Sequence, residues 1–190
     1  MHGEGVGLVF LKSLADAERD GDRILAVIRA SAENHGGHAA SLTAPNPKAQ
    51  AELLRTAYAR SGIDPRTVGY IEAHGTGTPL GDPIEVEALT GAFADLARDA
   101  EATFGPAPAQ SCAIGSVKSN IGHLELAAGI AGLIKVLLQM RHGEIARTLH
   151  CDELNPYLKL AGSPFHVAQQ ETAWSHLIDG DGNILPRRAG

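Results

Sequence analysis

The chain has 190 residues, a hydrophobic content of 44% and a formal net charge of −6, which suits one globular domain with a sizeable core. The acidic balance argues against a nucleic-acid-binding surface, because such a surface needs a basic face. The two cysteines stand far apart and no signal peptide is evident, so we expect a reducing, cytoplasmic setting rather than a disulfide framework.

The first third of the chain predicts two strands around one short helix. Apolar, β-branched runs at residues 6–11 and 24–28 are typical of buried strands. Ser13 is a suitable N-cap for a helix between them, which should end near Asp20. Residues 35–38 contain two glycines between histidines and predict a loop.

The middle of the chain alternates helix and strand signals. Asn46 before Pro47 predicts a helix start, since Asn caps the first turn and Pro suits its first position. This helix should end at Gly62, and residues 68–71 predict a buried strand. Asp82-Pro83 predicts another helix start, with Glu85 at capping-box spacing.

That helix should end near Arg98, before a loop at residues 105–109 and a strand at 113–117. Residues 124–140 predict a helix that is apolar nearly all round and hence central, with Gly129 and Gly132 allowing another backbone to pack closely. The segment is too short for a comfortable membrane span. Further strands are expected at 145–149 and 165–168, and the alternation predicts an α/β layered domain.

A histidine at a strand end, followed by a loop of glycine and threonine, is the most distinctive feature. His74 follows the strand at 68–71 and precedes Gly75-Thr76-Gly77-Thr78-Pro79-Leu80-Gly81. Glycine lets backbone approach a ligand closely, and the hydroxyls of Thr76 and Thr78 add donors and acceptors. A second histidine, His123, comes 49 residues later in another glycine-rich turn after a β-like run. Together the two motifs predict a reaction centre.

These motifs resemble the C-terminal half of a β-ketoacyl synthase, specifically the ketosynthase domain of a type I polyketide synthase. Further similar segments are a Gly-Glu-Gly hairpin region, a loop into the next helix, the helix after the second histidine and the approach to a closing strand, at residues 1–34, 42–47, 123–140 and 186–190. The resemblance implies an α/β, thiolase-like layered αβαβα fold, present in part. Residues from 1 to about 40 would be the last hairpin of the N-terminal half, and residues from about 41 to 190 the C-terminal half, truncated before its last strands.

The family reaction is a decarboxylative Claisen condensation. An acyl chain is held as a thioester on a cysteine, and a malonyl-type unit on the phosphopantetheine of an acyl carrier protein loses CO₂ and attacks it. The resemblance implies that His74 and His123 donate N–H groups to the enolate oxygen. It also implies that Thr76 and Thr78 bind the pantetheine arm. No cofactor is expected to bind directly.

The resemblance further implies that Lys118 orders the site with Glu125 as its ion-pair partner. The chain departs from the family at the nucleophile, because Cys112 and Cys151 lack the small residues and serines that neighbour the reactive cysteine. Neither precedes a helix N-terminus that would activate a thiolate. We therefore expect no nucleophile in this chain, which would be inactive alone. The expected partners are acyl carrier protein, the remainder of the synthase and a second copy in a homodimer, but not nucleic acid or a membrane.

Alternatives stay open for several of these residues. Thr76 and Thr78 also fit hydrogen bonding within their own turn, and Lys118 with Glu125 also fits a plain structural pair. The loop lacks the Gly-Lys-Ser/Thr ending of a nucleotide phosphate loop, and no short-range ligand spacing supports a metal site. A non-catalytic remnant or subunit that binds carrier protein, and a thiolase-type enzyme acting on coenzyme A esters, are the competing functions. Retention of both histidines and the lysine favours the condensing enzyme.

Overall fold

The computed structural model describes residues 1–37, 45–104 and 110–190, except for the side chains of 99–104. The helices are α1 (Leu14–Arg19), α2 (Pro47–Ser61), α3 (Gly81–Phe104), α4 (Lys118–Ile121) and α5 (Ala128–His142), with two 3-10 turns, η1 (Pro65–Thr67) and η2 (Glu125–Ala127). The strands are β1 (Tyr70–Glu72), β2 (Cys112–Gly115), β3 (Glu144–Ile145), β4 (Phe165–Val167) and β5 (Thr172–Ala173). The predictions for residues 38, 42–44 and 105–109 lie outside the described residues.

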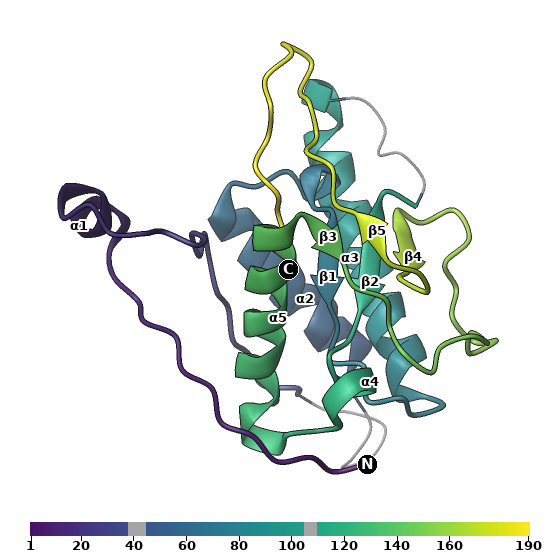
Figure 1. The fold of residues 1–190 in the computed structure, drawn as a ribbon. Helices are drawn as coiled ribbons and strands as arrows, with labels where there is room; N and C mark the ends of the chain where they lie inside the picture. Colours follow the sequence, from purple (N-terminus) through teal and green to yellow (C-terminus); the bar gives the residue numbers. More distant parts are fainter. Residues whose placement is uncertain (38–44, 105–109) are drawn as a thin grey trace.

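A parallel sheet in the order β1-β2-β4 forms the centre of the fold. Helices α2 and α3 cover one face of this sheet and α5 the other (Figure 1). The closing residues run beside the free edge of β1, where the N–H of Gly190 donates to the carbonyl of Tyr70 at 3.0 Å. The predicted α/β layering is confirmed, although the strand expected at 145–149 shortens to β3, which pairs with the unpredicted β5.

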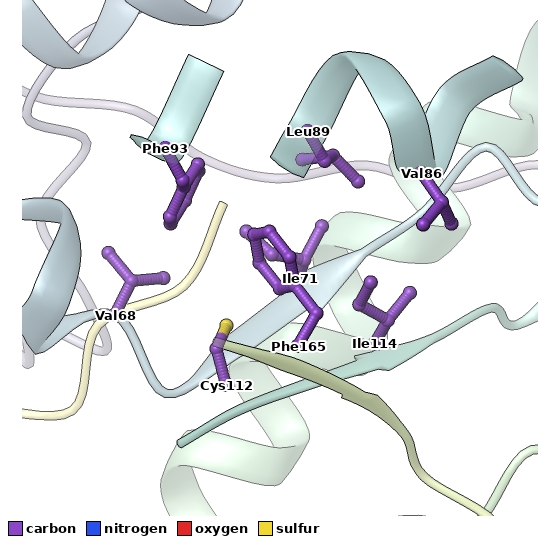
Figure 2. Packing of buried hydrophobic residues seen from close by; sticks show 8 residues of the cluster. All are labelled: Val68, Ile71, Val86, Leu89, Phe93, Cys112, Ile114 and Phe165. Atoms are coloured by element: carbon purple, nitrogen blue, oxygen red, sulfur yellow. The ribbon is translucent and has the colours of Figure 1, made fainter. Parts of the chain in front are cut away.

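The core beneath α3 depends on the two-residue period of the strands. Ile71, Cys112 and Ile114 point to one side of the sheet, where Phe165 and Phe93 join them (Figure 2). Tyr70 and Ala113 point to the other side and pack against Val136 of α5. The strands are thus buried on both faces, as expected for parallel strands between helical layers.

The local helix signals identify the helix starts correctly in two cases. Ser13 accepts the N–H of Asp16 at the start of α1. Asn46 accepts the N–H groups of Lys48 and Ala49 at the start of α2, and the helix ends at Gly62 with φ +63°. Both ends use residues whose side chain or backbone freedom suits that position.

Helix α3 differs from its prediction at both ends. It runs to Phe104, beyond the expected end near Arg98. The predicted capping box at Asp82 is wrong, because α3 already begins at Gly81, whose N–H donates to the hydroxyl of Thr78 at 3.0 Å. The carboxylate of Glu85 is engaged elsewhere, by the loop that carries His74.

The strands predicted at residues 6–11 and 24–28 are wrong. These segments are extended but exposed, with Val6 at 91% and Phe10 at 93% relative exposure. Figure 1 shows them as an arm that leaves the body and carries α1. A strand needs a neighbouring strand to pair with its backbone N–H and C=O groups. Among the described residues 1–34, the β-bridge to another segment is that between His2 and His123, outside both predicted strands.

Helix α5 begins at Ala128, after the turn η2, and is central on one face alone. Val136 is buried against the sheet, whereas Leu138 is 48% exposed. Gly132 lies against the side chain of Glu72 rather than a backbone, and Gly129 meets nothing within 4 Å. In the ranges covered by the structure, no helix is long and apolar enough to cross a membrane.

Candidate active site

The two predicted histidines meet at one edge of the sheet. The rings of His74 and His123 lie 5.5 Å apart between centroids, with an interplanar angle of 83°. Their proximity follows from topology, since β1 and β2 are parallel neighbours with Glu72 opposite Gly115. The loops after both strands therefore emerge at the same edge, where α/β proteins commonly bind ligands.

Two carboxylates at the start of α3 hold the loop after β1. Glu85 accepts the N–H of His74 at 2.6 Å through Oε1 and that of Gly75 at 3.0 Å through Oε2. Asp82 Oδ1 accepts the N–H of Gly77 at 3.1 Å. Carboxylates are favoured at a helix N-terminus by its dipole, so the backbone beneath His74 is fixed by charge-assisted hydrogen bonds.

We expect Glu85→Ala to loosen this loop, because it leaves the N–H groups of His74 and Gly75 without their acceptor. Hydrogen bonds to a charged group are worth about 1.5–3 kcal/mol, so amide exchange at these two residues should accelerate about 10–100-fold. Hydrogen exchange followed by NMR measures this in the intact protein. Glu87→Ala, at an exposed position of the same helix, is the matched control, and equal exchange in both variants would contradict the prediction.

His123 is held through its backbone and its ring. Its N–H donates to the carbonyl of Met1, and its own carbonyl accepts the N–H of Gly3, both at 3.0 Å. The ring Nδ1 accepts the N–H of Glu125 at 2.9 Å. A neutral imidazole has one acceptor and one donor nitrogen, so this hydrogen bond places the ring proton on Nε2.

His74 is kept in its neutral form by its surroundings. Partial burial lowers its pKa below the usual 6.5, and the positive charge of Lys118 lowers it further. The carboxylates of Glu85 and Asp82 act in the opposite direction, with a smaller net effect. A neutral ring is therefore the prevailing form at neutral pH, available as a hydrogen-bond donor.

The predicted ion pair between Lys118 and Glu125 is wrong. Glu125 instead pairs with His2, at 3.0 Å between Oε1 and Nδ1, and both side chains are exposed. Glu125 has a left-handed backbone with φ +50°, and its N–H is turned toward the ring of His123. Across the described ranges, no carboxylate lies within ion-pair distance of Lys118.

The two loop threonines are exposed beside the histidines. Thr78 accepts the N–H of Gly81, and its hydroxyl lies 3.4 Å from that of Thr76. This confirms that the hydroxyl oxygen of Thr78 accepts a hydrogen bond within its own turn. Ligand binding by Thr76 and Thr78 stays a prediction.

Neither cysteine lies in an activating environment. Cys112 is 1% exposed in the core, and burial raises the pKa of its thiol far above the usual value. Burial also raises the pKa of Cys151, with the nearby carboxylate of Asp152 adding to the effect. The part of the chain that the structure describes holds no cluster of three or more metal-ligating side chains.

Sequence reasoning missed a buried polar cluster directly under the site, formed by Tyr70, Glu72 and Lys135. Two signals were available. Glu72 stands two residues before His74, and Lys135 is the lone cation on the predicted apolar helix. A charged residue inside an apolar stripe needs a buried partner, so this lysine indicated that a buried partner exists without specifying which residue it is.

Comparison with known proteins adds sequence relatives. The family model "Beta-ketoacyl synthase, C-terminal domain" matches residues 25–152. The chain is 57% identical over 188 residues to polyketide synthase PksN of Bacillus subtilis, covering 98% of this chain and 3% of that protein. It is 45% identical over 190 residues to polyketide synthase ThaG of Burkholderia thailandensis, covering 100% and 3%. The chain thus spans a small part of these relatives.

Solved structures give the same result. The oxazolomycin ketosynthase domain OzmH KS7 of Streptomyces albus JA3453 matches with a TM-score of 0.85 and 46% identity, covering 94% of this chain and 30% of that one. The ketosynthase from module 6 of the bacillaene synthase of Bacillus subtilis 168 matches with a TM-score of 0.81 and 43% identity, covering 94% and 29%. These matches confirm the thiolase-like layered fold, present in part. The division near residue 40 stays a prediction.

Proposed function

The chain belongs to the β-ketoacyl synthase family, and from this premise we propose that it supplies the decarboxylating side of a ketosynthase active site within a longer polyketide synthase polypeptide. The enzyme would be an acyltransferase that extends a cysteine-bound acyl chain. Its second substrate would be a malonyl-type thioester on the phosphopantetheine of an acyl carrier protein. The paired imidazoles of His74 and His123, with the ring proton of His123 on Nε2, carry this proposal.

The chemistry requires stabilisation of one developing charge. The bond between the α-carbon of the malonyl unit and its carboxylate breaks, and CO₂ leaves. The electron pair of that bond stays with the thioester, which becomes an enolate. Two N–H donors aimed at the enolate oxygen stabilise it, at about 3–4 kcal/mol for each donor by comparison with other oxyanion sites. The enolate carbon then attacks the acyl thioester, and the cysteine leaves as a thiolate.

The charges around the histidines suit this step. Lys118 places a positive charge near His74, as its effect on the pKa of that ring indicates. A cation at this edge of the sheet stabilises an anionic intermediate. It also helps to keep the His74 ring neutral, so the ring N–H donates a hydrogen bond without transferring its proton. Thr76 and Thr78, exposed on the adjoining loop, are suited to hydrogen bonds with the amides of the pantetheine arm.

The acyl-carrying cysteine would lie outside residues 1–190. We expect Cys112 and Cys151 to remain unmodified when the protein is incubated with an acyl thioester, since burial raises the pKa of both thiols and the thiolate is the nucleophile. Peptide mass spectrometry of the acylated protein measures this. A stable acyl adduct that Cys151→Ala abolishes would contradict the assignment.

The experiment that tests the function is CO₂ release from malonyl-carrier protein by the complete synthase domain that carries this chain. We expect release that depends on the carrier-bound malonyl group, with acetyl-carrier protein as the blank. Binding of carrier protein without CO₂ release would instead support the non-catalytic alternative. The histidine variants that assign the step are described in the Discussion.

A further inference from the structure

A buried polar network lies between the sheet and α5 and includes Glu72, two residues before His74. Lys135 Nζ donates to the hydroxyl of Tyr70 at 2.6 Å and to Glu72 Oε2 at 2.8 Å, and the Tyr70 hydroxyl donates to the same oxygen at 2.6 Å. The side chains of Lys135 and Glu72 are 12% and 11% exposed. The ammonium also lies 5.2 Å from the centre of the Tyr70 ring.

The second oxygen of Glu72 extends this network into the site. Glu72 Oε1 accepts the N–H of Val117 at 2.6 Å. Val117 immediately precedes Lys118, and Glu72 is followed by Ala73 and His74. One carboxylate therefore joins the strand end that leads to the first histidine, the turn that leads to the lysine, and the helix that follows the second histidine.

Gly132 of α5 makes room for this carboxylate. A Cβ at residue 132 would lie 3.0 Å from Glu72 Cγ, closer than ordinary contact. The helix thus approaches Glu72 closely enough for Lys135, one turn further on, to reach the same side chain.

Stability alone is a poor explanation for such a network. Removing two charges from water is costly, and replacing a buried ion pair with apolar residues is often neutral or stabilising. A fully satisfied buried network does, however, fix the relative position of the elements it joins. The proposed reaction requires His74, His123 and Lys118 to be held in fixed positions relative to one another.

We propose that Glu72 and Lys135 are positioning residues, which hold the His74 strand end and the Val117–Lys118 turn in the geometry needed for decarboxylation. This inference rests on the proposed function. Glu72 suits the role because both carboxylate oxygens accept hydrogen bonds, Oε2 from Lys135 and Tyr70 and Oε1 from Val117. An amide has one accepting oxygen and one donating nitrogen, so glutamine at this position must break one of the two sides.

The test compares Glu72→Gln with Asp64→Asn in the complete synthase domain. Asp64 forms an equally buried ion pair with Arg66, with side chains 10% and 6% exposed, but it lies before β1, at the far end of the strand from the histidines. We expect E72Q to lower kcat for CO₂ release by about 10²-fold with little change in KM, the scale of a small misplacement of reacting groups. D64N should lose stability but retain kcat per folded molecule.

A double variant shows whether Glu72 and Lys135 act on kcat as one unit or independently. Lys135→Met should lower kcat as E72Q does, and E72Q/K135M should lose no more than the more impaired single variant, because groups that act as a unit are not additive. Losses that multiply in the double variant would overturn the inference. So would a kcat in E72Q equal to that of D64N at the same folded fraction.

The pKa of His74 gives a readout that needs no activity. Burial of this ring lowers its pKa most, Lys118 and His123 lower it further, and Glu85 and Asp82 raise it. Displacement of the Lys118 turn in E72Q should raise the pKa of His74 toward its usual value, as followed by NMR titration, whereas D64N should leave it unchanged. If the wild-type domain releases no CO₂, the proposed function fails, and the inference is then judged by this shift. An unchanged pKa in E72Q would overturn it.

Discussion

Replacing either histidine of the pair with alanine should slow CO₂ release from malonyl-carrier protein by about 10²–10³-fold, the cost of losing one donor to a developing oxyanion. The reason is the geometry of the pair. The rings of His74 and His123 lie edge to face with their centroids 5.5 Å apart, and the hydrogen bond from the N–H of Glu125 keeps the His123 proton on Nε2. The measurement is CO₂ release by the complete synthase domain.

Acylation of the cysteine should fall less in both variants, because that step develops no malonyl enolate. Measuring the acyl-enzyme by intact mass separates the two steps. His142→Ala, at an exposed position at the end of α5, is the matched control and should leave both steps unchanged. Wild-type CO₂ release in H74A and H123A would show that the two rings have been assigned the wrong role.

A conservative variant tests the tautomer of His123. His123→Gln keeps an amide N–H near the position of the ring Nε2–H, so it should recover part of the rate that His123→Ala loses. His123→Leu has similar bulk without a donor and should recover none. Equal rates in the two variants would mean that His123 contributes shape rather than a proton.

The predictions that succeeded depend on neighbours in sequence. Asn46 caps α2 through the N–H groups two and three residues on, and Gly62 ends the helix through its own backbone. Those interactions are complete within one turn. His74 and His123 do lie together, because β1 and β2 are parallel neighbours and the segments that follow them, including the short α4 before His123, emerge at the same edge.

The predictions that failed depend on contacts between distant residues. The apolar runs at 6–11 and 24–28 have a strand composition but no partner strand in the described structure, and strand pairing is not a local property. Glu125 is close to Lys118 in sequence, yet the positive φ of its backbone directs it to His2 instead. The Glu72–Lys135 pair joins residues 63 positions apart, so no local pattern specifies it.

Phe165→Ala should lower the free energy of unfolding by about 3–5 kcal/mol, the range for removing a buried aromatic side chain. Phe165 is 0% exposed, and its ring lies 4.8 Å from that of Phe93 at an angle of 63° (Figure 2). It therefore ties β4 to α3, and alanine would leave a cavity between them. Urea denaturation of the complete domain measures the loss.

The same substitution also shows whether the core positions the site. Phe93 lies on α3, whose first turns hold the His74 loop through Asp82 and Glu85. The contact with Phe165 is two turns further along that helix, so a cavity there should affect stability much more than CO₂ release per folded molecule.

Tyr157→Ala, 67% exposed on a loop, should change the unfolding free energy by less than about 0.5 kcal/mol. A loss below about 1 kcal/mol in F165A would mean that the β4–α3 contact contributes little to the fold. A fall in kcat as large as that of H74A would mean that α3 transmits the disturbance to the histidines.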